Sequence, residues 1–548
     1  MPPVTSLIPS IRSMFPGLST GTIMLDNAGG SQLPRCVIDA MREYMEKSFV
    51  QLHGDYPLSK QATAVIPRAR EVVKVFLGGD EGGGRSSAFG ATRAAGNPPP
   101  APSLGEGEKR PAGSAVGAGV GEVFFGSSST VLCYELAAAY ADARDACRNL
   151  DAAPADLREH FAKAVGATSG SVLGGAHGSL RDRLLTRDQI VVCTAGHEAN
   201  VGPWMRLALR GYTIVPWHVE PTRDGGGGTN WRPSLDTLKK LVNSRTLLVL
   251  MPQVSNILGE VWDVRGAAEI AHGAGARIVV DGVAYAPHRA PRMSELGCDW
   301  YVYSTYKVFG PHMAAMFGTH EAMGELVGPN HYFLDSKVPY KWELGNASHE
   351  AAAGIAALWD FVCQLASLDG FPSAAGGRSG QGVGSMDVVH RGDRGQASAT
   401  RNPPPTPSLG EGGVRQRDWS TPPTRDVFDR AFAIVRDLED RHTAQLIDYL
   451  KSKPSVRIVG PRHADSSRVG TISFTSTKTT PVQISHHLGA RNVAMRQGHA
   501  YSKRLVEQLA TDRDLHIDPA LGVARLSIQH YNSPEEIGVV CRALDEIL

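Results

Sequence analysis

The chain has 548 residues, of which 56 are Lys or Arg and 55 are Asp or Glu, so its formal net charge is +1. This length allows two or more domains and a large buried core. Because the positive and negative charges are nearly equal in number, the protein has no net electrostatic field that would attract polyanions. We therefore expect neither nucleic acid nor a membrane as a partner. The N-terminus lacks the pattern of a signal peptide, and no stretch is apolar enough to span a bilayer, which predicts a cytoplasmic protein.

A repeated proline-rich stretch is the first unusual feature along the chain. Residues 97–107 recur almost unchanged at 402–412. Each copy lies within a wider tract rich in Gly, Pro, Ser and Arg, about 78–120 and about 371–425, with too few apolar residues to form a core. We interpret both tracts as disordered insertions, because doubling the length of a loop costs only about 0.6 kcal/mol. A proline-rich docking motif is the alternative.

Short apolar runs alternate with helix-length segments from about residue 121 to 320. The runs that predict strands are 123–125, 189–193, 247–250, 277–280 and 301–304. Such a pattern is typical of an α/β fold with a mainly parallel central sheet that helices cover on both faces. In open sheets of this kind, ligands bind beyond the carboxyl ends of the strands.

The pattern changes after about residue 326. Helices follow, notably 427–453, and then short strands such as 470–474. We therefore expect an N-terminal segment and a large α/β domain in 1–325, and a smaller C-terminal α+β domain in 326–548. The N-terminal segment could pack against either domain.

Two polar residues follow predicted strands. Asp281 ends the run 277–280, and Lys307 comes shortly after 301–304. A carboxylate at one strand end can hold a pyridine nitrogen protonated, and a lysine amine beyond the next can form a Schiff base with the same ring's aldehyde. In the alternative interpretation, Asp281 caps a turn and Lys307 is a solvated lysine. The pairing predicts pyridoxal 5'-phosphate (PLP) as a cofactor.

The surrounding sequence favours the cofactor. Val-Asp-Gly at 280–282 and Ser-Thr-Tyr-Lys-Val-Phe-Gly-Pro at 304–311 closely resemble the cofactor-lysine region of cysteine desulfurases and other class V aminotransferases. The resemblance extends from about residue 22 to 536, interrupted by the two tracts. It implies the PLP-dependent transferase fold of type I and a homodimer, and it points most closely to the cysteine desulfurase-like branch of the family.

A phosphate site is predicted at 126–130, Gly-Ser-Ser-Ser-Thr, which follows a strand and precedes a helical run. The backbone amides and the dipole at a helix N-terminus suit an anion. The stretch resembles the family's phosphate turn, with Ser129 and Thr130 at its centre, although a plain serine-rich helix cap is the alternative. Ser304 and Tyr306 match positions that also contact the phosphate in the family.

Further cofactor residues follow from the same resemblance. His197, directly after a strand, matches the histidine that stacks on the pyridine face, where it could assist proton transfer and join Asp281 and Lys307 as a catalytic residue. Asn256 matches the asparagine that hydrogen-bonds the ring hydroxyl, although Asn-x-x-Gly is also an ordinary turn signal.

The seven cysteines are scattered and show no metal-ligand spacing, so no metal site is expected.

The resemblance also implies a small amino acid as substrate. Arg525, in Ala-Arg-Leu-Ser at 524–527, matches the arginine that pairs with the α-carboxylate, a planar anion that suits a bidentate guanidinium. Leu-Asp-Asn-Ala-Gly-Gly at 25–30 resembles an N-terminal signature that lies beside the substrate. Asn27 and Ala28 are therefore candidate substrate residues.

One departure concerns the sulfur chemistry. One group of cysteine desulfurases carries a nucleophilic cysteine shortly after Arg-x-Gly-His, whereas residues 496–502 here are Arg-Gln-Gly-His-Ala-Tyr-Ser, with Tyr501 at that position. A phenol cannot accept sulfane sulfur. We therefore favour a lyase that eliminates a β-substituent by breaking a C–S or related bond. A class V aminotransferase, an epimerase and a non-catalytic protein of this fold are the alternatives.

Overall fold

The structure is a computed structural model that describes residues 4–78, 121–149, 154–155, 158, 180–223, 229–334, 337–345, 347–368 and 421–548. Both proline-rich repeats, and nearly all of the two predicted insertions, lie outside the described residues, so their interpretation stays a prediction. Two compact units divide the chain, 1–370 with 423–548 and 371–422. All helices and strands of the described residues belong to the first unit.

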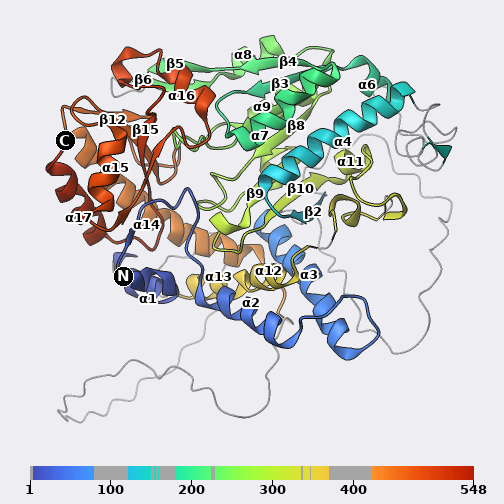
Figure 1. The fold of residues 1–548 in the computed structure, drawn as a ribbon, viewed down its shortest axis with the longest axis horizontal. Coiled ribbons are helices and arrows are strands. Elements are labelled where there is room, and N and C mark those ends of the chain that lie inside the picture. Colours follow the sequence, from blue (N-terminus) through green and yellow to red (C-terminus); the bar gives the residue numbers. More distant parts are fainter. Residues whose placement is uncertain are drawn as a thin grey trace, which may run out of the picture. The chain divides into compact units, whose positions relative to one another are not determined.

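A seven-stranded sheet lies at the centre of this unit (Figure 1). Its strands occur in the order β2-β10-β9-β8-β7-β3-β4. Strand β10 pairs antiparallel with β2 and β9, and all other pairs in this sheet are parallel. The predicted α/β fold with a mainly parallel central sheet is confirmed. The strands are β2 (Gly121–Gly126), β3 (Gln189–Cys193), β4 (Thr213–Trp217), β7 (Thr246–Pro252), β8 (Arg277–Asp281), β9 (Trp300–Ser304) and β10 (Ala314–Thr319).

Both faces of this sheet are buried, which explains the nearly continuous apolar runs. Alternate residues, such as Ile190 and Val192 of β3, join one core with helices α4 (Ser129–Asn149) and α7 (Glu198–Met205). Val191, which points to the other face, is fully buried as well. A sheet covered in this way leaves only its strand ends open to a ligand.

The sequence does not predict two of these strands. β4 contains Pro216 and lies at one end of the strand order, where its residues are mostly half-buried or exposed, so it lacks a continuous apolar pattern. β10 is rich in small residues, which give no strong strand signal. Both segments form strands because they pair with neighbouring strands, and not because their own residues have a high strand propensity.

The C-terminal part combines helices with short strands, as predicted, and its four-stranded sheet is antiparallel. Its order is β11 (Val456–Val459), β12 (Thr471–Ser476), β15 (Val523–Ser527) and β14 (Arg496–Gly498). The N-terminal segment joins this part, because β1 (Ile23–Met24) pairs in parallel with β13 (Val493–Ala494). The domain boundary at 325/326 stays a prediction.

The remaining helices and strands complete the framework. They are α1 (Ile8–Ser13), α2 (Arg35–Lys47), α3 (Pro57–Phe76), α6 (Leu180–Thr186), β5 (Val219–Arg223), β6 (Thr229–Pro233), α8 (Leu235–Leu241), α9 (Val264–Gly273), α10 (Met293–Leu296), α11 (His320–Gly324), α12 (His349–Ala356), α13 (Leu358–Ala366), α14 (Arg425–Lys451), α15 (Pro481–Gly489), α16 (Lys503–Leu509) and α17 (Pro534–Asp545). The predicted helix 427–453 corresponds to α14.

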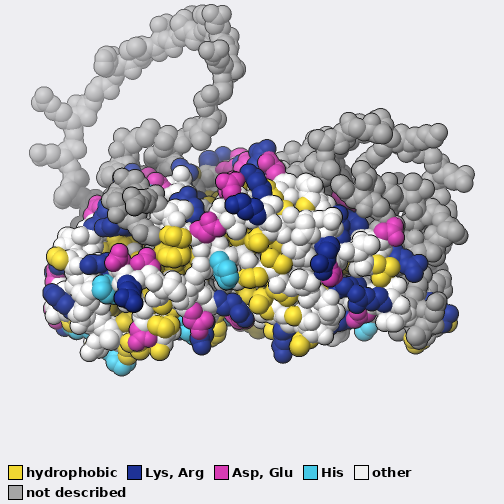
Figure 2. Space-filling model, turned by 90° about the horizontal axis from the view of Figure 1, so that it is seen from above, with side chains coloured by type: hydrophobic (Ala, Val, Ile, Leu, Met, Phe, Trp, Pro, Cys, Tyr) yellow, Lys and Arg dark blue, Asp and Glu magenta, His cyan; other side chains and the backbone are white. Residues whose placement is uncertain are grey.

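The surface carries charges of both signs. Figure 2 shows basic and acidic side chains interspersed over the visible face, in keeping with the net charge of +1. No helix in the described ranges combines the length and the apolar character that a bilayer crossing requires. The cytoplasmic location stays a prediction.

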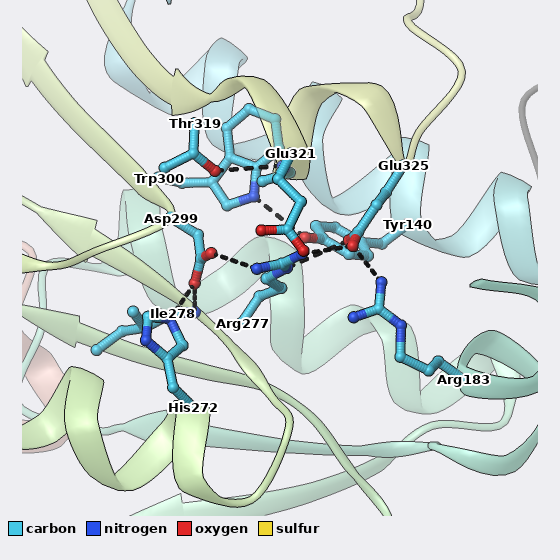
Figure 3. A network of polar contacts seen from close by, with 11 residues as sticks. Tyr140, Arg183, His272, Arg277, Ile278, Asp299, Trp300, Thr319, Glu321 and Glu325 are labelled. Carbon is cyan, nitrogen blue, oxygen red and sulfur yellow. Dashed lines mark hydrogen bonds and ion pairs between the residues drawn. The ribbon is translucent and has the colours of Figure 1, made fainter. Parts of the chain in front are cut away.

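A network of charged side chains fixes the amino end of β8, opposite to the end that carries Asp281 (Figure 3). Arg277 pairs with Asp299 at 2.9 Å and with Glu321 at 2.6 Å. The Nε2 atom of His272 lies 2.8 Å from an Asp299 carboxylate oxygen. The network connects β8 to α9 through His272, to the residue before β9 through Asp299 and to α11 through Glu321. It therefore holds the strand that ends on Asp281.

Stability should depend on pH through His272. Its hydrogen bond to Asp299 raises the pKa of His272, although burial acts in the other direction. A pKa that is higher in the folded than in the unfolded chain stabilises the fold below about pH 6.5, and this contribution is lost as the pH rises through the folded value. We expect His272→Gln to lower the melting temperature more at about pH 6 than at about pH 9. Thermal unfolding at both pH values is the measurement, and an equal loss at both would contradict the ion pair.

Candidate functional site

A cavity opens at the carboxyl end of the central sheet. It encloses about 490 Å³ of empty space, part of it open to solvent. Strand ends, the first turn of α4 and the start of α7 meet there. The lining residues are Ser129, Thr130, His197, Ala199, Pro252, Val254, Asn256, Asp281, Val283, Ala284, Tyr306 and Lys307.

Asp281 is the last residue of β8 and is buried. Its Oδ1 atom accepts a hydrogen bond of 2.9 Å from the Val283 N–H. Burial raises the pKa of Asp281, while the Val283 hydrogen bond and the nearby Lys307 oppose the rise. A carboxylate so poorly solvated is stabilised by a cationic partner within the cavity.

Lys307 ends the short 3-10 helix Thr305–Lys307 directly after β9, and only 9% of it is exposed. Burial and the charge of Arg525 lower the pKa of Lys307 to about 8, although Asp281 opposes this shift. A larger fraction of the amine is therefore uncharged near neutral pH than for a solvated lysine. Only the uncharged amine can attack an aldehyde carbon or take up a proton.

His197 caps the N-terminus of α7. Its Nδ1 atom accepts a hydrogen bond of 3.1 Å from the Ala199 N–H, which assigns the ring proton to Nε2. Burial, with the charges of Lys307 and Arg525, lowers the pKa of His197 to about 4. The ring is therefore neutral at physiological pH and can pack flat on an aromatic ligand.

The predicted phosphate residues meet at the start of α4. Ser129 is the first residue of this helix, and its hydroxyl accepts a hydrogen bond of 3.0 Å from the hydroxyl of Ser304, the last residue of β9. Ser304 therefore supports the site, although it does not line the cavity. Tyr306 and Thr130 are the other lining residues here. Hydroxyl groups at a helix N-terminus suit a phosphate group.

Asn256 connects the cavity to the loop after β14. Its Nδ2 atom donates a hydrogen bond of 2.8 Å to the Ala500 carbonyl, and its Oδ1 atom accepts one of 2.7 Å from the Ser502 hydroxyl. One N–H of the amide is left for a ligand. The side chain therefore anchors this loop, a role that its sequence context did not reveal.

Arg525 lies on β15 and is buried. Its Nη1 atom donates a hydrogen bond of 3.1 Å to the Asn256 carbonyl, and its Nη2 atom lies 3.6 Å from the Asp26 carboxylate. The Nε–H group has no hydrogen-bond partner among the described residues. A buried guanidinium with a spare N–H group and a long ion pair is suited to receive a second carboxylate.

The structure does not bring Asn27 or Ala28 into the cavity. The Asn27 amide donates to the Ser527 carbonyl at 2.8 Å and accepts from the Tyr531 hydroxyl at 2.6 Å. The Ala28 N–H donates to the Ser527 hydroxyl at 2.8 Å. These bonds fasten the loop to β15 and so place Asp26 beside Arg525. Asp26 is a residue of the quoted signature that sequence reasoning did not single out.

Comparisons with known proteins agree with this geometry. The model of the aminotransferase class-V family matches residues 23–82, 126–361 and 428–540, and members of that family typically use PLP. An aminotransferase-like protein of Gibberella zeae is 26% identical over 551 residues, covering 99% of this chain and 98% of that protein. A cysteine desulfurase-like protein of Aspergillus flavus is 28% identical over 377 residues, 68% of this chain and 70% of that protein.

Solved structures share the fold. A cysteine desulfurase from Thermococcus onnurineus NA1 has a TM-score of 0.63 at 18% identity, covering 98% of this chain and 97% of that one. The Escherichia coli cysteine desulfurase CsdA has a TM-score of 0.62 at 17% identity, with 98% of each chain covered. These matches confirm the fold class predicted from the sequence.

Proposed function

Since the chain belongs to the aminotransferase class-V family, we propose that it is a PLP-dependent enzyme that removes a β-substituent from a small amino acid. The observation that carries the proposal is the meeting of Lys307 and Asp281 in one cavity, with the charge of Arg525 acting on Lys307. The Arg525 guanidinium does not itself line the cavity, but it donates a hydrogen bond to the carbonyl of the lining residue Asn256. A purely structural protein needs no such combination of an amine, a carboxylate and a guanidinium.

The cavity suits the groups of the cofactor. Ser129 and Thr130 at the start of α4, with Tyr306 of the 3-10 helix Thr305–Lys307, would hold the phosphate, and His197 would pack on the ring face. Asp281, whose raised pKa reflects its poor solvation, would pair with the protonated ring nitrogen. When bound, PLP supplies an electron sink for the negative charge that develops at the substrate's α-carbon.

Two residues of the chain would then act on the substrate, one by binding it and one by accepting a proton. Arg525 binds the α-carboxylate and fixes the orientation of the amino acid. The Lys307 amine would take the α-proton, and its lowered pKa keeps part of it uncharged for this task. A substituent on the β-carbon can leave with the bonding electrons. Transamination and epimerisation share these residues up to that step.

The absence of a thiol from the cavity wall supports elimination over sulfur transfer to the protein. None of the residues that line the cavity, all of them described, is a cysteine. Cys133 is fully buried on α4, and burial together with the charge of Asp281 raises its pKa, which keeps the thiol protonated. A protonated, enclosed thiol is a poor acceptor of sulfur.

Product analysis with the purified enzyme tests the proposed function. The enzyme is mixed with cysteine or a related β-substituted amino acid, with and without a 2-oxo acid. Pyruvate release without an acceptor supports elimination, whereas turnover that depends on the 2-oxo acid would replace it by transamination. Absorbance at about 410–430 nm, in the range of lysine-bound PLP, verifies beforehand that the cofactor is present.

We also propose a homodimer. The segment 331–345 exposes several large apolar side chains, among them Phe333, which is 62% exposed, and Tyr332 and Leu344. Apolar side chains that gather on a surface are typical of a protein interface. We expect light scattering to give twice the chain mass of 58.5 kDa, and Phe333→Glu to shift the population toward monomer.

Leu209→Glu is the matched control for the dimer, because Leu209 is 89% exposed on a different segment, the 3-10 helix Arg206–Arg210. This variant should keep the mass of the wild type. A wild-type enzyme that is monomeric at high concentration would reject the dimer without affecting the proposed chemistry.

A further inference from the structure

A turn with unfavourable backbone geometry lies beside the cavity. Ala500 and Tyr501 have φ angles of +42° and +61°, in the left-handed region that side chains disfavour. Neither is a glycine, although Gly498 with φ +104° stands nearby. A pair of such residues persists only where the surrounding structure holds it, and this occurs mostly at functional sites.

Asn256 of the cavity wall and Glu198, the neighbour of the lining residue His197, hold this turn. The Asn256 side chain donates to the Ala500 carbonyl at 2.8 Å, and the Glu198 N–H donates to the Tyr501 carbonyl at 2.9 Å. The Tyr501 N–H donates to the Nδ1 atom of His499 at 3.1 Å. The backbone of Tyr501 is therefore held in place beside the cavity.

The Tyr501 side chain faces the ring of His197, which lines the cavity. The two ring centroids lie 5.2 Å apart with an angle of 37° between the planes. Tyr501 nevertheless remains 68% exposed. Covering an exposed aromatic ring with an apolar group of a ligand removes apolar surface from water and is favourable.

We propose that Tyr501 is a specificity-determining residue that packs against the uncharged substituent of an S-substituted cysteine, a thioether amino acid. This inference rests on the proposed function, whose substrate class it narrows. Thioether sulfur makes favourable contacts with aromatic rings, and the exposed Tyr501 ring beside His197 offers a surface to the group that sulfur carries. Free cysteine lacks such a group and would leave Tyr501 uncovered.

The reaction balances without a sulfur acceptor. Lys307 takes the α-proton, the bond between the β-carbon and sulfur breaks, and both electrons leave with sulfur, which gains a proton and departs as a thiol. Hydrolysis of the remaining unsaturated amine consumes one water and gives pyruvate and ammonia. No atom is oxidised or reduced by an outside reagent, so the lack of a cysteine at position 501 is no obstacle.

Binding to the PLP-loaded enzyme tests the inference. S-benzylcysteine and alanine are titrated against wild type, Tyr501→Phe and Tyr501→Ala, and apparent dissociation constants are read from the cofactor absorbance. We expect wild type to prefer S-benzylcysteine, Tyr501→Ala to lose about tenfold of that preference, and Tyr501→Phe to retain it within about threefold. Tyr56→Ala, which removes another exposed tyrosine at the start of α3, should keep the wild-type preference.

The outcomes separate the inference from the proposed function. An unchanged preference in a Tyr501→Ala variant that retains the cofactor absorbance would overturn the role of Tyr501 alone. A loaded wild type whose spectrum responds to no amino acid would instead reject the proposed function. Equal affinity of the wild type for both amino acids would also overturn the inference.

Discussion

Lys307→Ala is expected to abolish covalent attachment of PLP and to slow turnover by at least about 10²–10⁴-fold, the contribution typical of a positioned general base. Lys307 supplies the only amine among the described residues that line the cavity, and its pKa of about 8 suits both attack on an aldehyde and proton uptake. Borohydride reduction followed by peptide mass mapping should find the adduct on residue 307 of the wild type and none in the variant.

Lys503→Ala is the matched control for this result. Lys503 begins α16, close in sequence to the Tyr501 loop, and is exposed, with Glu507 as its ion-pair partner at 3.6 Å. Its removal should leave both the adduct and the rate within about twofold of wild type, as expected for an exposed ion pair. A borohydride adduct at any lysine other than 307 would refute the assignment of the cofactor lysine.

The strand ends were predictable because the parallel sheet itself brings them together. Asp281 ends β8 and Lys307 lies shortly after β9, and these consecutive strands pair side by side, so the two sequence positions already imply a shared edge. The burial that lowers the pKa of Lys307 arises from residues all along the chain, and no local pattern encodes it. A sequence motif therefore indicated the candidate site, whereas the pKa shift of Lys307 can be derived only from the folded structure.

The N-terminal loop shows where sequence reasoning stops. The signature at 25–30 indicated this segment, but the direction of its side chains depends on bonds to Ser527 and Tyr531, about 500 residues away in the chain. These contacts direct the Asn27 amide into the protein and place the Asp26 carboxylate near Arg525. Side-chain direction in a loop is set by such long-range partners and not by local propensity.

Asp281→Asn should separate cofactor attachment from cofactor chemistry. Asparagine keeps the size of the side chain and an oxygen that can accept the Val283 N–H, but it carries no negative charge to pair with a ring nitrogen. We expect the borohydride adduct on Lys307 to persist while turnover falls by about 10²–10³-fold, in the range seen when one preorganised electrostatic partner is removed. Pyruvate release and peptide mapping on the same sample are the measurements.

The pKa of Lys307 gives this variant a second readout. The Asp281 carboxylate raises the pKa of Lys307 against the larger effects of burial and Arg525, so its neutralisation should move the titration of the Lys307 amine in the cofactor-free protein to lower pH. Asp263→Asn is the control, because Asp263 also accepts a backbone N–H, from Gly266 at 2.8 Å, but caps α9 outside the cavity. If Asp281→Asn kept the full rate, the carboxylate would have no part in the chemistry, whereas an unshifted Lys307 titration would show that the two side chains are not coupled.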